Sequence, residues 1–321
     1  MNNELEIWQF AAERLKRNES VILLVVAESS GSSPGRQGYK MAVAEDEIIG
    51  SIGGGLMEIN LVESARRLLR NEEKNNFIKQ QVHRKKSPDT SGMICSGGQA
   101  IIFFKLSQNN LPTIRKVIRA LKKHLPAVLQ ISNLKFQIAE DLSNNFDFQF
   151  EQTDASAFLF QEKLGFKNRL FIIGGGHCAL ALSDLMSKMD FYITLFDDRP
   201  NLNTLEKNKF VHAKQIVESY VQIDEFIPSG ANHYVVVMTL GYKTDEIVIR
   251  RLLDKKFKYF GVLGSRAKMA TLLKNLKREG FPEEKLSRIH TPIGLQINSQ
   301  TPEEIAVSIA AEIIAVKNAT D

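Results

Sequence analysis

The sequence is poor in cysteine and has no apolar run long enough to cross a membrane. Its 2 cysteines among 321 residues form no C-x-x-C pair, which argues against a disulfide scaffold and a structural zinc site. The apolar run over residues 21–26 is far too short to span a bilayer. The first residues also lack the basic and then apolar pattern of a signal peptide. We therefore expect a cytoplasmic protein with no membrane partner.

Several enzyme signatures are also missing. The chain has no G-x-x-x-x-G-K-[ST] phosphate loop, no H-E-x-x-H zinc motif and no G-x-S-x-G nucleophile motif. Lys and Arg total 42, Asp and Glu total 37, and the resulting net charge of +5 is mild for this length. The densest basic segment, residues 84–86, is more typical of a solvated loop than of a nucleic-acid patch. We expect no nucleic-acid partner and no metal site, although the charge favours a small anionic ligand.

The length fits two α/β domains. We expect an N-terminal domain with a mixed sheet over residues 1–162 and a C-terminal domain over 168–321, joined near 161–168. Strand and helix patterns alternate in the second half, which predicts a Rossmann-like, doubly wound parallel sheet. Helices are expected over residues 4–16, 56–69, 111–125, 179–188, 244–254, 265–279 and 303–316, and a loop of Ser, Gly and Pro over residues 28–38.

A glycine-rich loop comes directly after the apolar run 169–173, which has the pattern of a buried parallel strand. The loop reads G-x-G-x-x-A: Gly174 makes the turn, Gly176 allows a ligand close to the backbone, and Ala179 allows tight helix packing. Asp197 lies about twenty residues further on, where a ribose would need an acceptor. This order predicts a Rossmann-like unit. Its glycine loop either binds a dinucleotide or serves only to pack the helix against the strand. The candidate cofactor-binding residues here are Gly174, Gly175, Gly176, His177 and Asp197.

A second glycine turn lies in the first half, where Gly53, Gly54 and Gly55 open a helix. Their N–H groups suit an anion at the helix N-terminus, and Arg36 adds a permanently charged fork that suits phosphate. Glu58 falls in the first turn of that helix, where a glutamate also simply stabilises the helix dipole. From these local features alone, an anion site and a plain tight turn are about equally well supported.

Two further segments carry candidate site residues. Ser265 suits the N-cap of a helix, and Arg266 stands next to it where an anion would dock. Cys95 lies in a Gly/Ser-rich loop, where an exposed thiolate can carry sulfur or bind a soft metal, although a lone cysteine is commonly a small buried hydrophobe. Cys178 fits the buried interpretation better. A position at a helix N-terminus would still lower its pKa.

In combination, these segments resemble the XdhC/CoxI family, the accessory factors of xanthine dehydrogenase and related molybdenum hydroxylases. The resemblance extends over most of both halves of the chain. The segments that carry it are residues 31–36, 50–58, 92–95, 174–177, 197–199, 235–239, 263–266, 292–295 and 301–306.

The resemblance implies a cytoplasmic chaperone, a homodimer, that binds molybdenum cofactor (molybdopterin) as cargo. Such a chaperone protects the cofactor during its sulfuration, with a cysteine desulfurase as a further partner, and hands it to a xanthine dehydrogenase-type apo-enzyme. It also implies that Cys95 and Glu58 handle the cofactor. Two other hypotheses stay open: an NAD(P)-dependent oxidoreductase that uses the Rossmann-like domain, and an assembly protein whose glycine motifs bind nothing.

Overall fold

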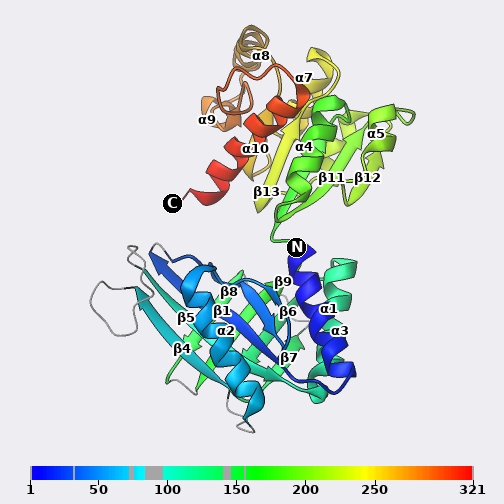
Figure 1. The fold of residues 1–321 in the computed structure, drawn as a ribbon. Coiled ribbons are helices and arrows are strands. Elements are labelled where there is room, and N and C mark those ends of the chain that lie inside the picture. Colours follow the sequence, from blue (N-terminus) through cyan, green and yellow to red (C-terminus); the bar gives the residue numbers. More distant parts are fainter. Residues whose placement is uncertain are drawn as a thin grey trace. The chain divides into compact units, whose positions relative to one another are not determined.

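The computed structural model describes residues 2–31, 33–71, 76–83, 97–139, 146–154 and 157–319. The chain forms two compact units, Met1–Gly165 (unit 1) and Phe166–Asp321 (unit 2), shown in Figure 1. Their boundary lies inside the segment 161–168 where we expected a linker. Strands occupy most of that segment, and only residues 165–167 lie between them.

Unit 1 consists of two antiparallel sheets and three α-helices in its described part. One sheet has the strand order β3-β2-β1-β5-β4 and the other has the order β7-β6-β9-β8. The strands are β1 (Val21–Gly31), β2 (Lys40–Val43), β3 (Ile48–Gly50), β4 (Phe77–His83), β5 (Gly97–Leu106), β6 (Ala127–Ser132), β7 (Phe136–Ala139), β8 (Phe148–Gln152) and β9 (Phe158–Leu164), and the helices are α1 (Asn2–Lys16), α2 (Gly55–Arg70) and α3 (Leu111–Lys123), preceded by a 3₁₀ turn, η1 (Gln108–Asn110).

Both faces of the five-stranded sheet of unit 1 are buried. Alternate residues of β1, such as Ile22 and Leu24, pack with α2, while Leu23 and Val25 pack with α1, α3 and the second sheet. Because successive side chains of a strand point to opposite faces, burial on both sides requires a continuous apolar run. This explains the unbroken apolar segment that starts at Val21. Trp8 of α1 lies fully buried in the core between the five-stranded sheet, α1, α3 and the second sheet.

Unit 2 has a parallel sheet with the strand order β12-β11-β10-β13-β14-β15. Helices α4 and α10 cover one face, and α7 and α8 cover the other (Figure 1). The elements are β10 (Asn168–Ile173), α4 (His177–Ser187), β11 (Phe191–Asp197), α5 (Asn203–Lys207), β12 (Ala213–Ile216), η2 (Tyr220–Gln222), α6 (Ile223–Phe226), β13 (Gly230–Val237), α7 (Tyr242–Leu252), β14 (Phe257–Val262), α8 (Arg266–Arg278), α9 (Glu283–Leu286), β15 (Ile289–His290) and α10 (Pro302–Asn318).

These units confirm the predicted fold class, including the doubly wound parallel sheet. Three details differ from the sequence-based expectation. The sheets of unit 1 pair only antiparallel strands within the described residues, whereas we expected a mixed sheet. Strand β1 continues through residues 28–31, which we expected in a loop, because their backbone pairs with β5 although their side chains are polar or absent. The short strands β12 and β15 lack a long apolar run and were not predicted.

None of the described helices has both the length and the apolar composition that crossing a bilayer would require. The longest of them, α10, has 17 residues and starts with a capping box, in which Thr301 accepts from the Glu304 backbone N–H at 3.2 Å. Pro302 occupies its first turn, where the missing backbone N–H of a proline breaks no helical hydrogen bond.

A buried lysine joins three elements of unit 1. The Nζ atom of Lys40, in β2, lies 2.5 Å from Oε2 of Glu162 in β9 and 2.9 Å from Oε1 of Glu4 in α1. It also donates to the Gly38 carbonyl at 3.0 Å. Burial alone lowers the pKa of Lys40, but the two carboxylates outweigh it and hold that pKa well above its usual value. The ammonium is therefore charged, and the pairing ties both sheets to α1.

We expect Lys40→Met to lower the free energy of unfolding by about 3 kcal/mol, because it leaves the buried Glu162 carboxylate without its cation. Urea unfolding of the full chain measures the change. Arg70→Met is the matched control, because Arg70 pairs with Glu45 on the surface of the same unit and its loss should cost less than about 0.5 kcal/mol. Equal losses for the two variants would contradict a structural role for the Lys40 pairing.

Candidate functional site

The loop after β1, which contains Gly35, lies against the glycine turn of residues 53–55 that opens α2. A Cβ placed on Gly35 would stand 2.1 Å from the Ile52 carbonyl oxygen, and one placed on Gly53 would stand 2.6 Å from the Gly35 nitrogen. No side chain fits at such distances, so glycine at both positions allows the loop after β1 to pack backbone on backbone against the turn before α2. The motifs around Gly35 and Gly53, far apart in the sequence, therefore form one structure.

Glu58 holds this turn from inside. Its Oε2 atom accepts from the backbone N–H groups of Ile52 at 2.8 Å and Gly54 at 2.9 Å, and from Oγ of Ser51 at 2.7 Å. The carboxylate therefore fixes the turn that opens its own helix. This is more than the helix-dipole role predicted from its position, and it occupies one of the backbone donors that we assigned to an anion, the Gly54 N–H.

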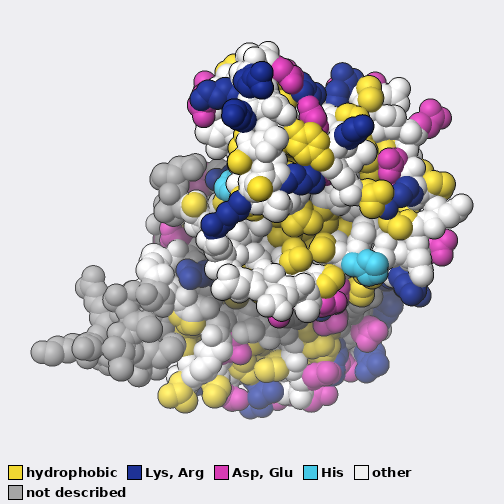
Figure 2. Space-filling view, turned by 90° about the horizontal axis from the view of Figure 1, so that it is seen from above, with side chains coloured by type: hydrophobic (Ala, Val, Ile, Leu, Met, Phe, Trp, Pro, Cys, Tyr) yellow, Lys and Arg dark blue, Asp and Glu magenta, His cyan; other side chains and the backbone are white. Residues whose placement is uncertain are grey.

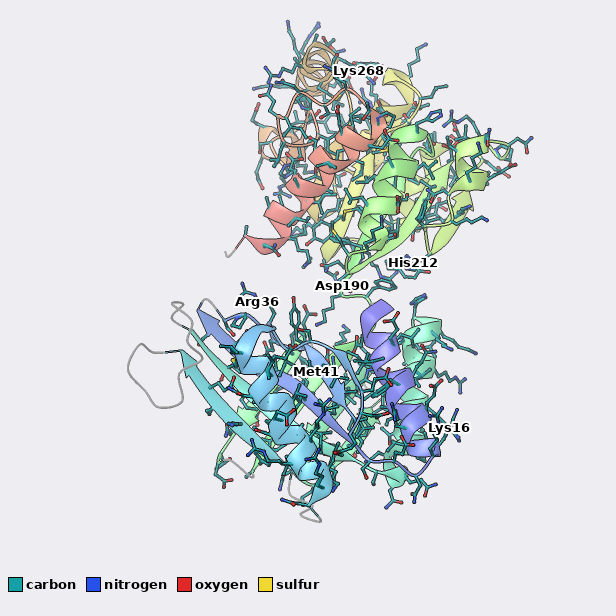
Figure 3. All side chains as sticks on the ribbon, in the orientation of Figure 1. Lys16, Arg36, Met41, Asp190, His212 and Lys268 are labelled. Atoms are coloured by element: carbon teal, nitrogen blue, oxygen red, sulfur yellow. The ribbon has the colours of Figure 1, made fainter. Side chains whose placement is uncertain are left out.

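The start of α2 nevertheless keeps an open end. Gly54 is the N-cap without any side-chain capping hydrogen bond, and no heavy atom of the described chain lies within 4 Å of a Cβ built on Gly54 or Gly55. Both glycines have positive φ, of 76° and 73°, which L side chains rarely adopt. Arg36 is exposed, its side chain makes no hydrogen bond or ion pair within the described residues, and it lies at the end of unit 1 where α2 begins (Figure 3). A flexible cation thus accompanies uncapped N–H groups.

In unit 2 the candidate residues gather at the carboxyl edge of the parallel sheet. The loops after β10, β11, β13, β14 and β15 all leave the sheet at this edge, the usual ligand crevice of such folds. Figure 2 looks onto it and shows apolar side chains with Lys and Arg side chains around them. The exposed apolar residues of these loops include Leu240, Leu295 and Ile297.

In the glycine loop of unit 2, Gly174, Gly176 and Ala179 each occupy the structural position that the G-x-G-x-x-A motif predicts. Gly174 has a φ of 104°, and a Cβ there would stand 2.3 Å from the Met238 carbonyl oxygen, so it makes the turn and allows the loop after β13 to approach. Ala179 is fully buried against the sheet. A Cβ on Gly176 would have no heavy atom of the described residues within 4 Å, and no side chain among them caps α4 there. The backbone next to Gly176 is therefore open, as close approach of a ligand requires.

Asp197 differs from its predicted role. Its fully buried carboxylate accepts from the Gly175 N–H at 2.6 Å, from the Arg199 N–H at 2.9 Å, and from Nε and Nη2 of Arg199 at 2.9 and 2.8 Å. Burial raises the pKa of this carboxyl, but the hydrogen bonds from Arg199 and Gly175 outweigh it, so the pKa lies below its usual value. With both oxygens engaged inside the protein, Asp197 positions the glycine loop, and this geometry offers no free acceptor for a ribose.

A second loop at this edge is fixed in the same way, by residues that the sequence analysis did not assign to the site. Asp245, 1% exposed, accepts from the Thr239 N–H at 3.1 Å and from Oγ1 of Thr239 at 2.6 Å. Its other oxygen pairs with Nζ of Lys268 at 2.7 Å, and Figure 3 labels Lys268 in α8. Three residues from α7, α8 and the loop after β13 thus meet. No spacing rule predicts such a meeting, because it depends on how two helices pack.

The third predicted junction is capped internally. Oγ of Ser265 accepts from the Lys268 N–H at 3.3 Å, which confirms Ser265 as the N-cap of α8. Because this hydroxyl already occupies the helix end, an anion would meet a capped terminus at α8 but uncapped termini at α2 and α4. Arg266 and His177 are exposed at the first positions of α8 and α4. The three junctions are therefore not equivalent.

Of the two cysteines, the structure describes only Cys178. Cys178 lies half-buried in the first turn of α4 and packs against the α4–α10 core. Burial and the nearby charge of Glu303 raise its pKa, so the helix N-terminus does not activate this thiol as its position suggested. Cys95 lies outside the described residues. Within the described ranges, no group of three or more His, Cys, Asp or Glu side chains is placed to hold a metal ion.

Two family models match the chain. Residues 170–313 match the family described as the XdhC Rossmann domain, and residues 14–79 match the XdhC and CoxI family. The first match lies in unit 2 and the second in unit 1, and together they cover well over half of the chain. The chain belongs to the XdhC and CoxI family. This confirms the resemblance drawn from the sequence motifs.

Individual relatives of this XdhC/CoxI protein are distant. It is 24% identical over 98% of its length to the uncharacterized protein YqeB of Escherichia coli K12, and 30% identical over 51% of its length to a Bacillus subtilis 168 protein described as a probable xanthine dehydrogenase subunit. It spans only 47% of each of these proteins. A crystal structure from Bacillus halodurans, described as a xanthine dehydrogenase, has a TM-score of 0.72 at 21% identity and covers 98% of this chain and 96% of that one, which shows a shared fold.

We expect Asp197→Asn to lower the free energy of unfolding by about 2 kcal/mol at neutral pH, because the bonds to the Arg199 guanidinium lose their ionic acceptor. The pKa of Asp197 is depressed in the folded state. Its contribution is therefore complete above the unfolded pKa of about 4 and is lost as the pH falls through the lower, folded value.

Denaturant unfolding of the wild type and the variant, repeated from pH 7 down to acid, measures this difference. Asp198→Asn is the matched control, because its carboxylate is more exposed and lies 3.8 Å from Nε of Arg199. It should change the stability by less than about 0.5 kcal/mol. A gap between Asp197→Asn and wild type that stays constant down to acid pH would show that the charge of Asp197 does not hold the loop.

Proposed function

We propose that this protein is an accessory chaperone that binds molybdenum cofactor, supports its sulfuration and inserts it into a xanthine dehydrogenase-type molybdenum hydroxylase. Membership of the XdhC and CoxI family supports this role. So do a relative named as a probable component of xanthine dehydrogenase and a structural neighbour described as a xanthine dehydrogenase.

The observation that carries the proposal is the open start of α2. Molybdopterin ends in a phosphate, and Gly54 and Gly55 leave the helix N-terminus uncapped beside Arg36, whose side chain has no partner among the described residues. Backbone N–H groups and the helix dipole attract an anion, and a guanidinium matches a phosphate with two parallel hydrogen bonds. Unit 1 therefore offers a cradle for the cofactor's anionic end. Glu58 keeps that cradle in shape.

The carboxylates near the candidate sites favour a carrier over an independent enzyme. A general base needs a carboxylate or imidazole with a free lone pair beside the reacting atom. Within the described residues, Glu58, Asp197 and Asp245 accept hydrogen bonds from the loops that they hold. They supply shape to the loops. A chaperone needs such shape and a sheltered anion site, and it needs no proton relay of its own.

The Rossmann-like loop of unit 2 supports a second, related site. Gly176 leaves α4 uncapped and open, which favours a phosphate there, from a dinucleotide or from the cofactor itself. An NAD(P)-dependent oxidoreductase is the alternative function that this loop suggests. The enclosed Asp197 weighs against it, because the usual ribose contact has no free acceptor in this geometry.

The proposed transfer of the cofactor requires two partner proteins. A xanthine dehydrogenase-type apo-enzyme receives the cofactor, and a cysteine desulfurase is the proposed source of sulfur. We further propose that the protein acts as a homodimer in the cytoplasm, where both partners would be found.

The test uses the full chain, isolated molybdenum cofactor and an apo-hydroxylase. The loaded protein should activate the apo-enzyme, while the protein alone should show no steady hydride transfer to alcohols, 2-hydroxy acids or purines. Arg36→Ala should weaken cofactor retention by about tenfold, the loss expected for hydrogen bonds to a charged group. Arg119→Ala, an exposed arginine on α3, should leave retention unchanged. Robust turnover without a client would favour the oxidoreductase instead.

Cys95 provides a separate prediction, which rests on its sequence context. Its Gly/Ser-rich segment and the family motif Gly-Met-Ile-Cys favour a role in cofactor retention or sulfur transfer. We expect Cys95→Ser to reduce client activation at least tenfold with an unchanged melting temperature, because a hydroxyl neither binds a soft metal nor carries sulfur. Cys178→Ser is the control and should leave activation unchanged. If both variants activate the client like wild type, Cys95 has no part in the handover.

A further inference from the structure

A buried amide in unit 1 has no partner within the described residues. Gln99, in β5, is 1% exposed, and neither its Nε2 nor its Oε1 atom makes a hydrogen bond there. Buried polar groups are almost always satisfied, because losing water without gaining a partner costs free energy. An amide with both ends unpaired is thus an unusual feature of this core.

Gln81 adds a second orphaned oxygen at the same place. It pairs directly with Gln99 across β4 and β5, so the two side chains point to the same face of the sheet. That face is the one covered by α2, because Ile101 and Phe103, two and four residues after Gln99, pack in the α2 core. The Oε1 atom of Gln81 is buried and also has no partner in the described part of the chain.

The amide lies at the glycine turn that opens α2. A Cβ built on Gly35 would stand 3.1 Å from Nε2 of Gln99 and 2.1 Å from the Ile52 carbonyl oxygen. Because Gly35 has no side chain, the loop after β1 can lie against both the amide and the Ile52 carbonyl. Arg36 is the next residue after Gly35, and Gly53 touches Gly35. The orphaned amide and the proposed phosphate cradle are parts of one local structure.

On one edge, a glutamine amide presents one of its two N–H donors beside its carbonyl acceptor. Its natural complement is a lactam edge, a ring N–H next to a ring carbonyl, which forms two parallel hydrogen bonds with it. Pterins carry such an edge, and a flat ring also suits a site lined by glycine. An aliphatic anion would satisfy the arginine and leave the amide unpaired.

We propose that Gln99, assisted by Gln81, recognises the lactam edge of a pterin, while Arg36 and the open end of α2 hold the phosphate of the same ligand. This inference rests on the proposed function and deepens it, because it separates ring recognition from phosphate binding. It also explains why an unpaired amide persists in the core: the ligand satisfies it.

The test exploits the opposite effects expected on stability and binding. Gln99→Met keeps a similar volume and removes both polar atoms, so the ligand-free protein should melt at the same or a higher temperature than wild type. Its affinity for isolated molybdopterin, followed by pterin fluorescence, should fall by about tenfold or more, which is the loss expected for two hydrogen bonds. Gln80→Met is the matched control. Its side chain is exposed on β4 and donates to Gln152 at 3.0 Å, and binding should not change.

Binding of a phosphate-free pterin tests ring recognition by Gln99 separately from phosphate binding by Arg36. Gln99→Met should weaken it as much as it weakens molybdopterin, whereas Arg36→Ala should weaken molybdopterin alone. A lower melting temperature for Gln99→Met would show that the amide has a partner inside the protein, and would overturn the inference. Wild-type affinity in Gln99→Met would overturn it as well, while the proposed function would stand. If the wild-type chain binds no pterin at all, the proposed function fails and the inference fails with it.

Discussion

Carboxylates that accept hydrogen bonds from backbone N–H groups hold the loops on which both candidate sites depend. Glu58 binds the turn before α2, Asp197 binds the glycine loop after β10, and Asp245 binds the loop after β13. A fourth carboxylate, Glu312 of α10, accepts from the Gly294 N–H at 2.9 Å and from the Tyr259 hydroxyl. Burial raises the pKa of Glu312, but hydrogen bonds from His290, Tyr259 and Gly294 outweigh it and leave that pKa lowered.

This arrangement constrains what the protein can do with its acidic residues. An ionic acceptor makes strong hydrogen bonds to N–H groups, so each loop has a fixed shape before any ligand arrives. In Asp197 and Asp245 these and further bonds engage both carboxylate oxygens, the atoms that a general base would use, whereas in Glu58 they engage Oε2 alone. A protein built in this way is well suited to hold a cargo molecule in a preformed cradle. These four carboxylates contribute geometry to the loops that they hold.

The sequence predicted the features that depend on local rules. The G-x-G-x-x-A segment specified the conformations at Gly174, Gly176 and Ala179, because each role depends only on the size of a side chain within one turn. Ser265 was identified as an N-cap for the same reason. The fold class could be predicted from the order of apolar runs, which encode strand and helix without any knowledge of contacts.

The features that the sequence could not predict depend on groups that meet through folding. Asp197 occupies the expected position at the end of β11, yet Arg199 and Gly175 capture its oxygens, and a count of residues cannot reveal that competition. The contact between Gly35 and Gly53 joins two motifs that lie far apart in the sequence. The pairing of Asp245 with Lys268 requires two helices to be in place.

The features that point to ligands are accordingly the ones that the protein leaves unsatisfied. Helices α8 and α10 are capped by the hydroxyls of Ser265 and Thr301, each of which accepts from one backbone N–H of the first turn. Helices α2 and α4 begin at glycines that have, within the described chain, no side-chain cap and open space beside them. Of these two, only α2 begins beside a buried amide with no partner among the described residues. An uncapped helix end at the surface is satisfied by bulk water, whereas a buried amide is cut off from bulk water. The amide is therefore the stronger evidence, and it favours ring recognition in unit 1.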